Sequence, residues 1–513
     1  MTVENENEHK VLVNRMAMNR TRWVVLLSLS IAHIAYCQDT FVPPEELRAQ
    51  LQQAYTTPDV MQAGFSNSNN GGITFDREQR SHLMEVLAER LQDMRDPEIA
   101  IAYSQMGPAA KGEKADAPPK KKAWYEKLGI RGYAQFRYNF TVDEDEDSAP
   151  AQNPNDRSVG NNQTFLLRRA RLIFFGDITE HVYIYLQPDF AATPNGAVDN
   201  IQFTQIRDWF ADWYFDKEKV YRLRIGSSKV PYGWENMQSS SNRLALDRND
   251  PLNSAVKNER DMGLFFYWTP EYAQKFFSDV MDKGLKGSGN FGVFALGVYA
   301  GQGGALAEVN DTLHSVIRLT LPHEFYNGQY MEVSVQAYTG FYAVYSSQIR
   351  ANGVGPLIRP TGTVETGDRR GWLDQRIAGT FVWYPQPLGF QAEWNVGQGP
   401  ALNEAQNAIE SKPLNGGYAQ IMYRHDTCTH GILFPFTRWQ YFTGGYKSER
   451  NAPDSYINEW EVGLEWQINP SIELTTIYTM TNRTNTTALT TVGDPSYRQF
   501  KGDLIRCQLQ FNY

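Results

Sequence analysis

The chain has 513 residues, of which 41% are hydrophobic, 13% aromatic and 21% charged, and its formal net charge is -9. This acidic balance argues against a general nucleic-acid-binding surface, and three cysteines are too few for a disulfide framework. After residue 37 no run of about 18 apolar residues occurs, which excludes transmembrane helices. A mean hydropathy of -0.51 resembles that of a soluble protein, but such an average mixes the two faces of every amphipathic strand.

The first 37 residues have the pattern of a secretory signal peptide. A basic region precedes a short apolar stretch at 23–32, which is typical of export signals and too short to span a bilayer. The basic residues are Arg15, Arg20 and Arg22. We expect cleavage after Cys37, and the sequence leaves open whether Met16 or Met18 is the true start and whether Cys37 carries a lipid.

Residues 38–123 differ in composition from the rest of the chain. One face of a predicted amphipathic helix carries Leu83, Val86, Leu87 and Leu91. The stretch at 66–72 has the composition of a flexible linker, and 111–122 is basic and contains proline. We expect a helical or disordered periplasmic extension. Its role stays open between a tether to peptidoglycan, a trimer-stabilising coiled coil and an inert spacer.

From residue 124 the hydrophobic period changes from that of a helix to that of a strand. In 130–140 the even positions are apolar or small, whereas the odd positions are mostly polar. The same alternation recurs at 181–189, 390–396, 459–468 and 505–513. Each of these stretches is predicted to be a strand with one apolar and one polar face. Residues 124–513 are therefore predicted to form one all-β domain.

Two architectures accept many such strands, a soluble sandwich and an outer-membrane barrel with a polar lumen. Strand lengths of about 9 to 12 residues match tilted membrane-spanning strands and exceed the globular average. Aromatic pairs such as Tyr267-Trp268 and Trp383-Tyr384 stand at strand ends, as interfacial girdles require. We predict a transmembrane antiparallel β-barrel that contacts outer-membrane lipid. It has about 16 strands, and about 14 or about 18 also fit the length.

The last strand ends on an aromatic residue, Tyr513. A free strand end would be an aggregation edge in a soluble sandwich, whereas barrel closure pairs it. This ending resembles the signal that the barrel-assembly machinery reads, so that machinery is an expected partner. Earlier, the acidic run at 143–147 lies in a long polar connection. A solvated loop is the favoured interpretation of this run, and a divalent-cation site is the alternative.

Three stretches of the sequence resemble the phosphate-selective porin O/P family. They are FLLRRARL at 165–172, LRIG at 223–226 leading into KVPYGWE at 229–235, and NERDMGL at 258–264. The resemblance is dense from about residue 130 to about residue 270, and it is carried by strand rhythm afterwards. It implies a 16-stranded outer-membrane barrel, commonly a homotrimer, that passes small solutes by diffusion.

Anion-selective members of that family line the lumen with arginine and lysine. Along such a series of cations an anion replaces its hydration shell with charge-assisted hydrogen bonds, and no single site binds it too tightly to release it. In this chain, strand parity places six arginines on polar faces. Two of them follow if Leu166, Ala170, Leu172 and Phe174 face lipid, two follow if Tyr221, Leu223 and Ile225 do, and two follow from the alternation at 130–140. The inward arginines are Arg131, Arg137, Arg169, Arg171, Arg222 and Arg224. An arginine facing lipid near the midplane would cost about 2–4 kcal/mol, which favours this assignment.

Two further pore-lining candidates, Lys229 and Arg260, belong to the family-like motifs themselves, where a structural role is the alternative. Several acidic residues are also assigned to the lumen: Asp208, Asp212, Glu393, Glu459, Glu461 and Glu465. Two interpretations therefore stay open. In one the arginines pair with these acids across the barrel, as in general porins, and in the other they attract small anions. Phosphate selectivity is a hypothesis at this point.

The sequence does not favour an enzyme. Neither G-x-S-x-G nor a P-loop motif occurs, and His425 and His430 near Cys428 lack the complete spacing of a zinc site. We expect no catalytic residue, metal or cofactor. The prediction is an outer-membrane porin that passes small hydrophilic solutes. The alternative is a secreted carbohydrate-binding β-protein, whose aromatic side chains would gather on one face or in loops instead of in two belts at strand ends.

Overall fold

The structure is a computed structural model that describes residues 123–144, 159, 165–192, 203–304, 310–345, 357–358, 371–404, 408–427, 429–449, 451–486 and 497–513. The predicted signal peptide, the extension up to residue 122, most of the acidic run at 143–147 and Cys428 lie outside the described residues. Within the described part, no helix is long and apolar enough to cross a membrane.

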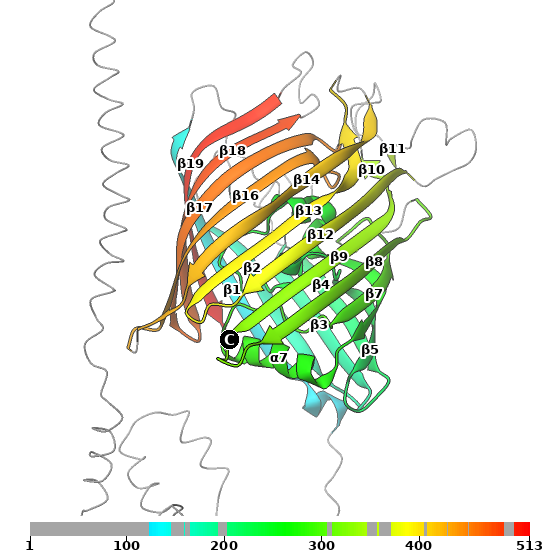
Figure 1. The fold of residues 1–513 in the computed structure, drawn as a ribbon, viewed down its shortest axis with the longest axis vertical. Helices are drawn as coiled ribbons and strands as arrows, with labels where there is room; N and C mark the ends of the chain where they lie inside the picture. Colours follow the sequence, from blue (N-terminus) through cyan, green and yellow to red (C-terminus); the bar gives the residue numbers. More distant parts are fainter. Residues whose placement is uncertain are drawn as a thin grey trace, which may run out of the picture. The chain divides into compact units, whose positions relative to one another are not determined.

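The main sheet is antiparallel and closes on itself as a barrel of 16 strands (Figure 1). The strands are β1 (Gly129–Glu144), β2 (Phe165–Asp177), β3 (Val182–Ala192), β4 (Phe203–Tyr214), β5 (Tyr221–Lys229), β6 (Arg260–Trp268), β7 (Phe294–Tyr299), β8 (His314–Glu324), β9 (Tyr330–Tyr342), β12 (Trp372–Trp383), β13 (Leu388–Leu402), β14 (Ile409–Tyr423), β16 (Ile432–Gly445), β17 (Asp454–Asn469), β18 (Ile472–Thr486) and β19 (Tyr497–Asn512). The short β15 (His425–Asp426) pairs with β16 just beyond the end of β14. β10 (Val344–Tyr345) and β11 (Leu357–Ile358) form a separate small sheet.

Closure of the barrel joins the last strand to the first. β19 pairs with β1, and Gly132 and Tyr513 exchange two backbone hydrogen bonds of 2.6 and 3.0 Å. A Cβ atom at Gly132 would come within 2.4 Å of both the Tyr513 ring and the Arg171 carbonyl oxygen. A glycine is therefore required where the terminal aromatic ring lies against β1. The predicted pairing of the terminal strand is confirmed.

The two faces of each strand differ as the alternation predicts. On β17, Trp460 is 50% exposed on the outer face, whereas Glu459, Glu461 and Glu465 are buried on the inner face. Large apolar side chains are likewise exposed on the outside of other strands, among them Phe136, Trp209, Leu264, Ile317 and Ile377. The apolar surface thus points outward and the charged side chains point into the lumen, as in a membrane barrel.

The predicted aromatic pairs at strand ends are only half on the outside. Trp268 is exposed at the end of β6, but its neighbour Tyr267 is fully buried on the inner face. Likewise Trp383 lies on the outer side of β12, while Tyr384 is buried. Successive residues of a strand point to opposite faces, so only one member of each pair can face lipid.

Two β-bulges interrupt the alternation of the strands, so that some residues point to the opposite side of the barrel from the side that the sequence pattern predicts. Against β1, the register of β2 shifts between the pairs Gln135–Arg169 and Phe136–Leu167, which leaves Arg168 as an extra residue. Beyond this bulge Leu166 lies opposite Arg137 and shares its face. The expectation that Leu166 faces lipid is therefore wrong.

A second bulge lies in β4. The pairs Gln187–Asp208 and Pro188–Ile206 follow each other, so that Arg207 is the extra residue there. Simple alternation misses both bulges because each adds one residue to a single strand and so reverses the facing of the residues before it.

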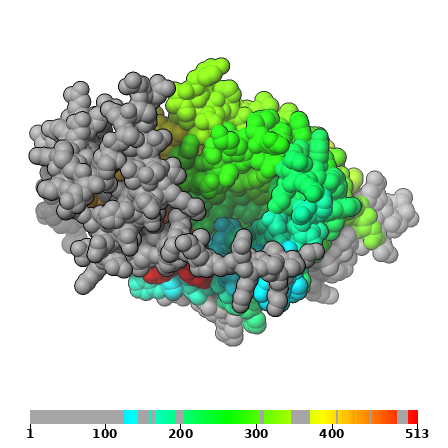
Figure 2. All heavy atoms as spheres, turned by 90° about the horizontal axis from the view of Figure 1, so that it is seen from below, coloured from blue at the N-terminus to red at the C-terminus, as the bar shows by residue number. Residues whose placement is uncertain are grey.

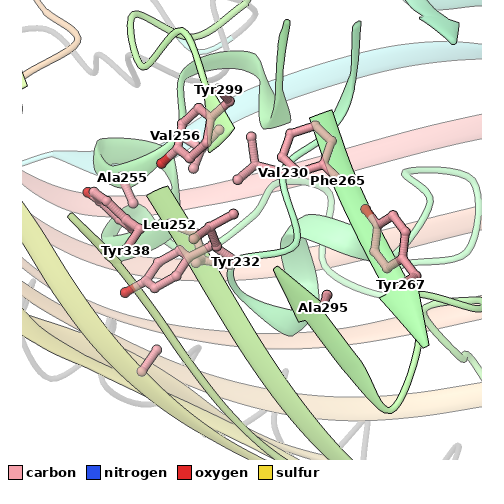
Figure 3. Close-up of a cluster of buried hydrophobic side chains, with 12 residues drawn as sticks. Val230, Tyr232, Leu252, Ala255, Val256, Phe265, Tyr267, Ala295, Tyr299 and Tyr338 are labelled. Atoms are coloured by element: carbon pink, nitrogen blue, oxygen red, sulfur yellow. The ribbon is translucent and has the colours of Figure 1, made fainter. Parts of the chain in front are cut away.

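The connection between β5 and β6, residues 230–259, folds inside the barrel, and we call it the inner loop. It contains α5 (Trp234–Met237), α6 (Asp250–Ala255) and η2 (Lys257–Glu259). The Asn249 side chain caps α6 by accepting a hydrogen bond from the Leu252 amide, 3.1 Å away. Tyr232 and Leu252 gather with side chains of the wall such as Phe265 in one buried apolar cluster (Figure 3). The inner loop therefore has a packed core against β6 to β9.

The connection between β6 and β7, residues 269–293, enters the barrel from the other end, and we call it the α7 connection. Helix α7 (Glu271–Asp282) lies at the lower end of the barrel as drawn in Figure 1. Its Phe276 and Phe277 belong to a buried cluster with Trp234 of the inner loop. Gln238 and Asn242 then donate hydrogen bonds to backbone oxygens at 286 and 287, at 2.6 and 2.8 Å. The two connections thus meet inside the barrel.

Candidate pore wall

The inner loop is hydrogen-bonded to many strands around the barrel wall. Its side chains or backbone exchange hydrogen bonds with β1, β2, β9, β12, β13, β16, β18 and β19. Partly exposed side chains on the inner face gather on β2 to β4, among them Arg168, Phe175, Tyr183, Tyr185 and Arg207. Figure 2 shows the lower end hollowed between the green atoms, which include the α7 connection, and the cyan to turquoise atoms of the first strands.

Most arginines on β2 to β6 pair with carboxylates of neighbouring strands. Arg171 on β2 binds Asp189 on β3 at 2.9 Å. Arg224 on β5 forms two hydrogen bonds with Asp212 on β4, at 2.7 and 2.8 Å, and Arg222 lies 3.6 Å from the same carboxylate. The interpretation in which arginines pair with acids thus applies to these residues. Their partners lie along the same wall instead of across the barrel.

Two predicted arginines lie where the inner loop meets β1 and β2. Arg137 is fully buried and donates hydrogen bonds to Asp247 of the inner loop at 3.3 Å and to Gln508 at 2.7 Å. Arg169 donates to the side-chain oxygen of Gln135 at 2.7 Å. Among the described residues, no carboxylate forms an ion pair with Arg169.

The remaining candidates have different surroundings. Lys229 donates to the carbonyl oxygens of Met237 and Gln238, at 2.9 and 2.8 Å, and so fixes the first turn of the inner loop. Arg260 binds Asp208 at 2.7 Å. Arg131 is exposed, and its guanidinium carbon lies 5.0 Å from the centre of the Phe175 ring.

Sequence reasoning misses four arginines of this region. Arg168 and Arg207 are the extra residues of the two bulges, and Arg243 and Arg248 belong to the inner loop, which has no strand parity. Arg243 is buried, and its Nε and Nη1 atoms have no hydrogen-bond partner among the described residues. The double arginine of the FLLRRARL stretch is the one sequence signal that points to Arg168.

Shared carboxylates are the electrostatic feature of this wall. Asp189 lies 2.9 Å from Arg171 and 3.5 Å from Arg207. Asp247 binds Arg137, Arg168 and Arg506, and Asp212 binds Arg222 and Arg224. Each of these carboxylates is thus outnumbered by guanidinium groups.

Glu259 of the inner loop is the fourth shared carboxylate. It binds Arg260, Arg243 and Arg248 at 2.6, 3.4 and 3.5 Å. Burial by itself would raise its pKa, but the three guanidinium groups outweigh burial and hold the pKa of Glu259 well below its usual range.

The predicted lumen acids on the opposite wall anchor the two connections. Glu393 accepts hydrogen bonds from the Trp234 backbone amide and from Thr380. Arg483 bridges Glu459, at 2.6 Å, and Asp250 of the inner loop, at 2.8 Å. Glu465 forms an ion pair with Lys286 of the α7 connection. No cluster of His, Cys, Asp and Glu suited to a metal ion occurs in the described part of the chain.

The family model for phosphate-selective porin O and P matches residues 147–513. Similar solved structures include the outer membrane channel DcaP of Acinetobacter baumannii (12% identity, TM-score 0.44, 75% of this chain and 97% of that chain). The loop L8 deletion mutant of OmpT from Vibrio cholerae (8%, 0.42, 75% and 99%) and an anion-selective porin from Comamonas acidovorans (10%, 0.40, 75% and 99%) are also similar. A search of curated proteins gives no significant match.

The family match spans well over half of the chain, and it agrees with a closed 16-stranded barrel whose apolar face points outward. Family and fold indicate a channel of the outer membrane. The chain therefore belongs to the phosphate-selective porin O and P family of outer-membrane porins.

Proposed function

We propose that this porin passes small hydrophilic anions by passive diffusion, along a path that follows the partly exposed inner face of β2 to β4. On β1, β2, β5 and β6, in and beside this wall, stand the pore-lining candidates Arg131, Arg137, Arg169, Arg171, Arg222, Arg224, Lys229 and Arg260. The α7 connection and the inner loop occupy the lumen beside β12 to β18, which leaves the wall of β2 to β4 as the partly exposed one.

One observation carries the proposal of anion preference. Asp189, Asp212, Asp247 and Glu259 are each shared by at least two arginines, and Arg169 has no carboxylate partner among the described residues. The wall therefore carries more positive than negative charge. Fixed guanidinium groups raise the local concentration of anions, whereas the shared carboxylates keep any single position from binding an anion too tightly to release it.

Reversal potentials in planar bilayers test this proposal. The full chain, reconstituted in a steep KCl gradient, is expected to be anion-selective. Arg169→Ala is expected to lower the anion-to-cation permeability ratio by roughly twofold or more, because it removes a positive charge from the path. Lys217→Ala removes the same charge from a side chain that is 73% exposed in the turn between β4 and β5, and it serves as the control. Cation selectivity, or equal effects of the two changes, contradicts the proposal.

Selectivity for phosphate is the finer proposal that family membership supports. A solute that binds the arginines reduces the current carried by a solute that does not, because both use one path. Phosphate added to KCl is then expected to lower the chloride current at concentrations where sulfate has a smaller effect. Equal inhibition by the two anions contradicts phosphate selectivity, and it leaves the general preference for anions intact.

The assembly state is also a proposal. The family is commonly homotrimeric, and the terminal strand ending at Tyr513 has the form that the barrel-assembly machinery recognises. Chemical cross-linking of the protein in its native membrane is expected to yield a trimer that survives heating, and without the cross-linker the trimer should dissociate on heating. A monomer under all conditions contradicts this expectation.

A further inference from the structure

Three aromatic rings from neighbouring strands form a row on the inner face near the lower end of the barrel. Phe175 on β2 lies opposite Tyr185 on β3, and Tyr185 lies opposite Phe210 on β4. The rings of Tyr185 and Phe210 are stacked, with centroids 5.1 Å apart and planes 12° apart. We call these three residues the aromatic row.

Guanidinium groups stand at both ends of the aromatic row. Arg224 lies 3.8 Å from the centre of the Phe210 ring, and its charge is matched by the two hydrogen bonds to Asp212. Arg131 lies 5.0 Å from the centre of the Phe175 ring. Its side chain is exposed, and no carboxylate among the described residues pairs with it. The Arg131 end thus combines an open cation with an open aromatic ring.

The aromatic row is not needed to fill the barrel. Phe175 and Tyr185 are partly exposed, whereas the packed clusters between the inner loop and the wall are fully buried. The Tyr185 hydroxyl donates to Gln187 at 2.8 Å, so that the ring, and not the hydroxyl, is available to a solute. Phe210 is buried. Polar side chains are the usual lining of a barrel lumen, and the two partly exposed rings of Phe175 and Tyr185 are therefore a departure that points to a solute with an apolar face.

We propose that the aromatic row and Arg131 form a binding subsite for small organic acids that carry an aromatic ring, with benzoate as the simplest example. The solute ring stacks on Phe175 and Tyr185, while its carboxylate accepts hydrogen bonds from the Arg131 guanidinium. An inorganic anion gains nothing from the rings. The subsite rests on the proposed channel function and narrows its substrate class from anions in general to aromatic carboxylates.

Benzoate and acetate give a matched pair of probes, because they carry the same charge and differ in the ring. In bilayers containing the full-length protein, benzoate is expected to reduce the KCl current at about fivefold lower concentration than acetate, which is the magnitude of one ring–ring contact. Tyr185→Leu and Phe175→Leu are expected to remove most of this difference. Arg131→Gln is expected to weaken inhibition by both acids.

Phe174→Leu is the control, because Phe174 is the neighbour of Phe175 on β2 and lies opposite Ile130 on the outer face. It is expected to leave the benzoate preference unchanged.

Saturation-transfer NMR on detergent-purified protein measures benzoate binding without a conductance measurement, and it can be used for any variant that inserts poorly into bilayers. Equal inhibition by benzoate and acetate, while the KCl conductance is intact, overturns the subsite and leaves the channel function standing. A wild-type protein without conductance overturns the channel itself. If Tyr185→Leu and Phe175→Leu keep the preference for benzoate over acetate, the aromatic row is not the binding subsite.

Discussion

Lys286 and Glu465 form an ion pair inside the barrel, where their side chains are 1% and 2% exposed. Lys286 belongs to the α7 connection and Glu465 to β17, so this pair ties the lower connection to the wall opposite β1 to β6. The Lys286 ammonium group also lies 4.9 Å from the centre of the Phe434 ring. The segment around Lys286 thus reaches across the lumen to β16 and β17.

Lys286→Ala is expected to destabilise the barrel. Removal of one partner leaves the Glu465 carboxylate buried without its counter-ion, which costs about 3–5 kcal/mol. The temperature at which the folded form is lost on unheated gels should fall accordingly. The double change Lys286→Met with Glu465→Gln is expected to recover most of the loss, because it removes both charges. An unchanged transition temperature in Lys286→Ala would show that the pair contributes nothing.

Asp189→Asn is expected to increase anion selectivity. Arg171 and Arg207 share this carboxylate, and its neutralisation leaves both guanidinium groups without their counter-ion. The anion-to-cation permeability ratio should rise by roughly twofold or more, and inhibition by phosphate should strengthen. Asp282→Asn, which alters an exposed carboxylate at the end of α7, is the control. A lower ratio in Asp189→Asn would mean that Asp189 assists anion passage directly.

The barrel itself was accessible from the sequence, because a strand with one face in lipid and one in a polar lumen must alternate. Trp460 and Glu459 illustrate this, since neighbouring positions on β17 have opposite surroundings. The bulges at Arg168 and Arg207 could not be predicted. A bulge is defined by two residues of one strand lying opposite one residue of its neighbour. The sequence of one strand alone does not show which residues of the neighbouring strand it pairs with.

The inner loop shows the same limit on a larger scale. Its position depends on bonds to residues more than a hundred positions away, such as Arg376 to the Ser254 hydroxyl at 2.6 Å. These long-range contacts leave no periodic pattern in the sequence. The sequence therefore predicts that Glu393 and Glu465 face the lumen, but it does not predict that they anchor the inner loop and the α7 connection. Helix α7 is different, because its buried residues Ala273, Phe276, Phe277 and Val280 follow the i, i+3, i+4, i+7 spacing of an amphipathic helix. It could have been predicted from the sequence and was nevertheless missed.

The stability of the wall is expected to depend on Glu259 at acidic pH. Its pKa is held well below the ordinary value by Arg260, Arg248 and Arg243, so the folded state binds fewer protons than the unfolded state. The stabilisation is fully present above the unfolded pKa of about 4.3 and is lost as the pH falls below it. The wild type should therefore begin to lose its stability advantage over Glu259→Gln below about pH 5, and should go on losing it as the pH falls towards the lower pKa of the folded state. Unfolding measured across this range checks the sign, and a constant difference between the two proteins would contradict it.

Gly132→Ala is expected to impair closure of the barrel. The added Cβ atom would meet the Arg171 carbonyl oxygen and the Tyr513 ring at 2.4 Å, and the backbone oxygen cannot move without breaking the pairing of β1 with β2. Overpacking of this kind costs about 1–3 kcal/mol, and it acts where the first and last strands join. The folded fraction after refolding into detergent, measured on unheated gels, should therefore fall. Gly379→Ala adds the same methyl group on β12, where no atom lies within 4 Å, and it should fold like the wild type. Equal folding of the two variants would show that the contact between Gly132 and Tyr513 does not govern closure.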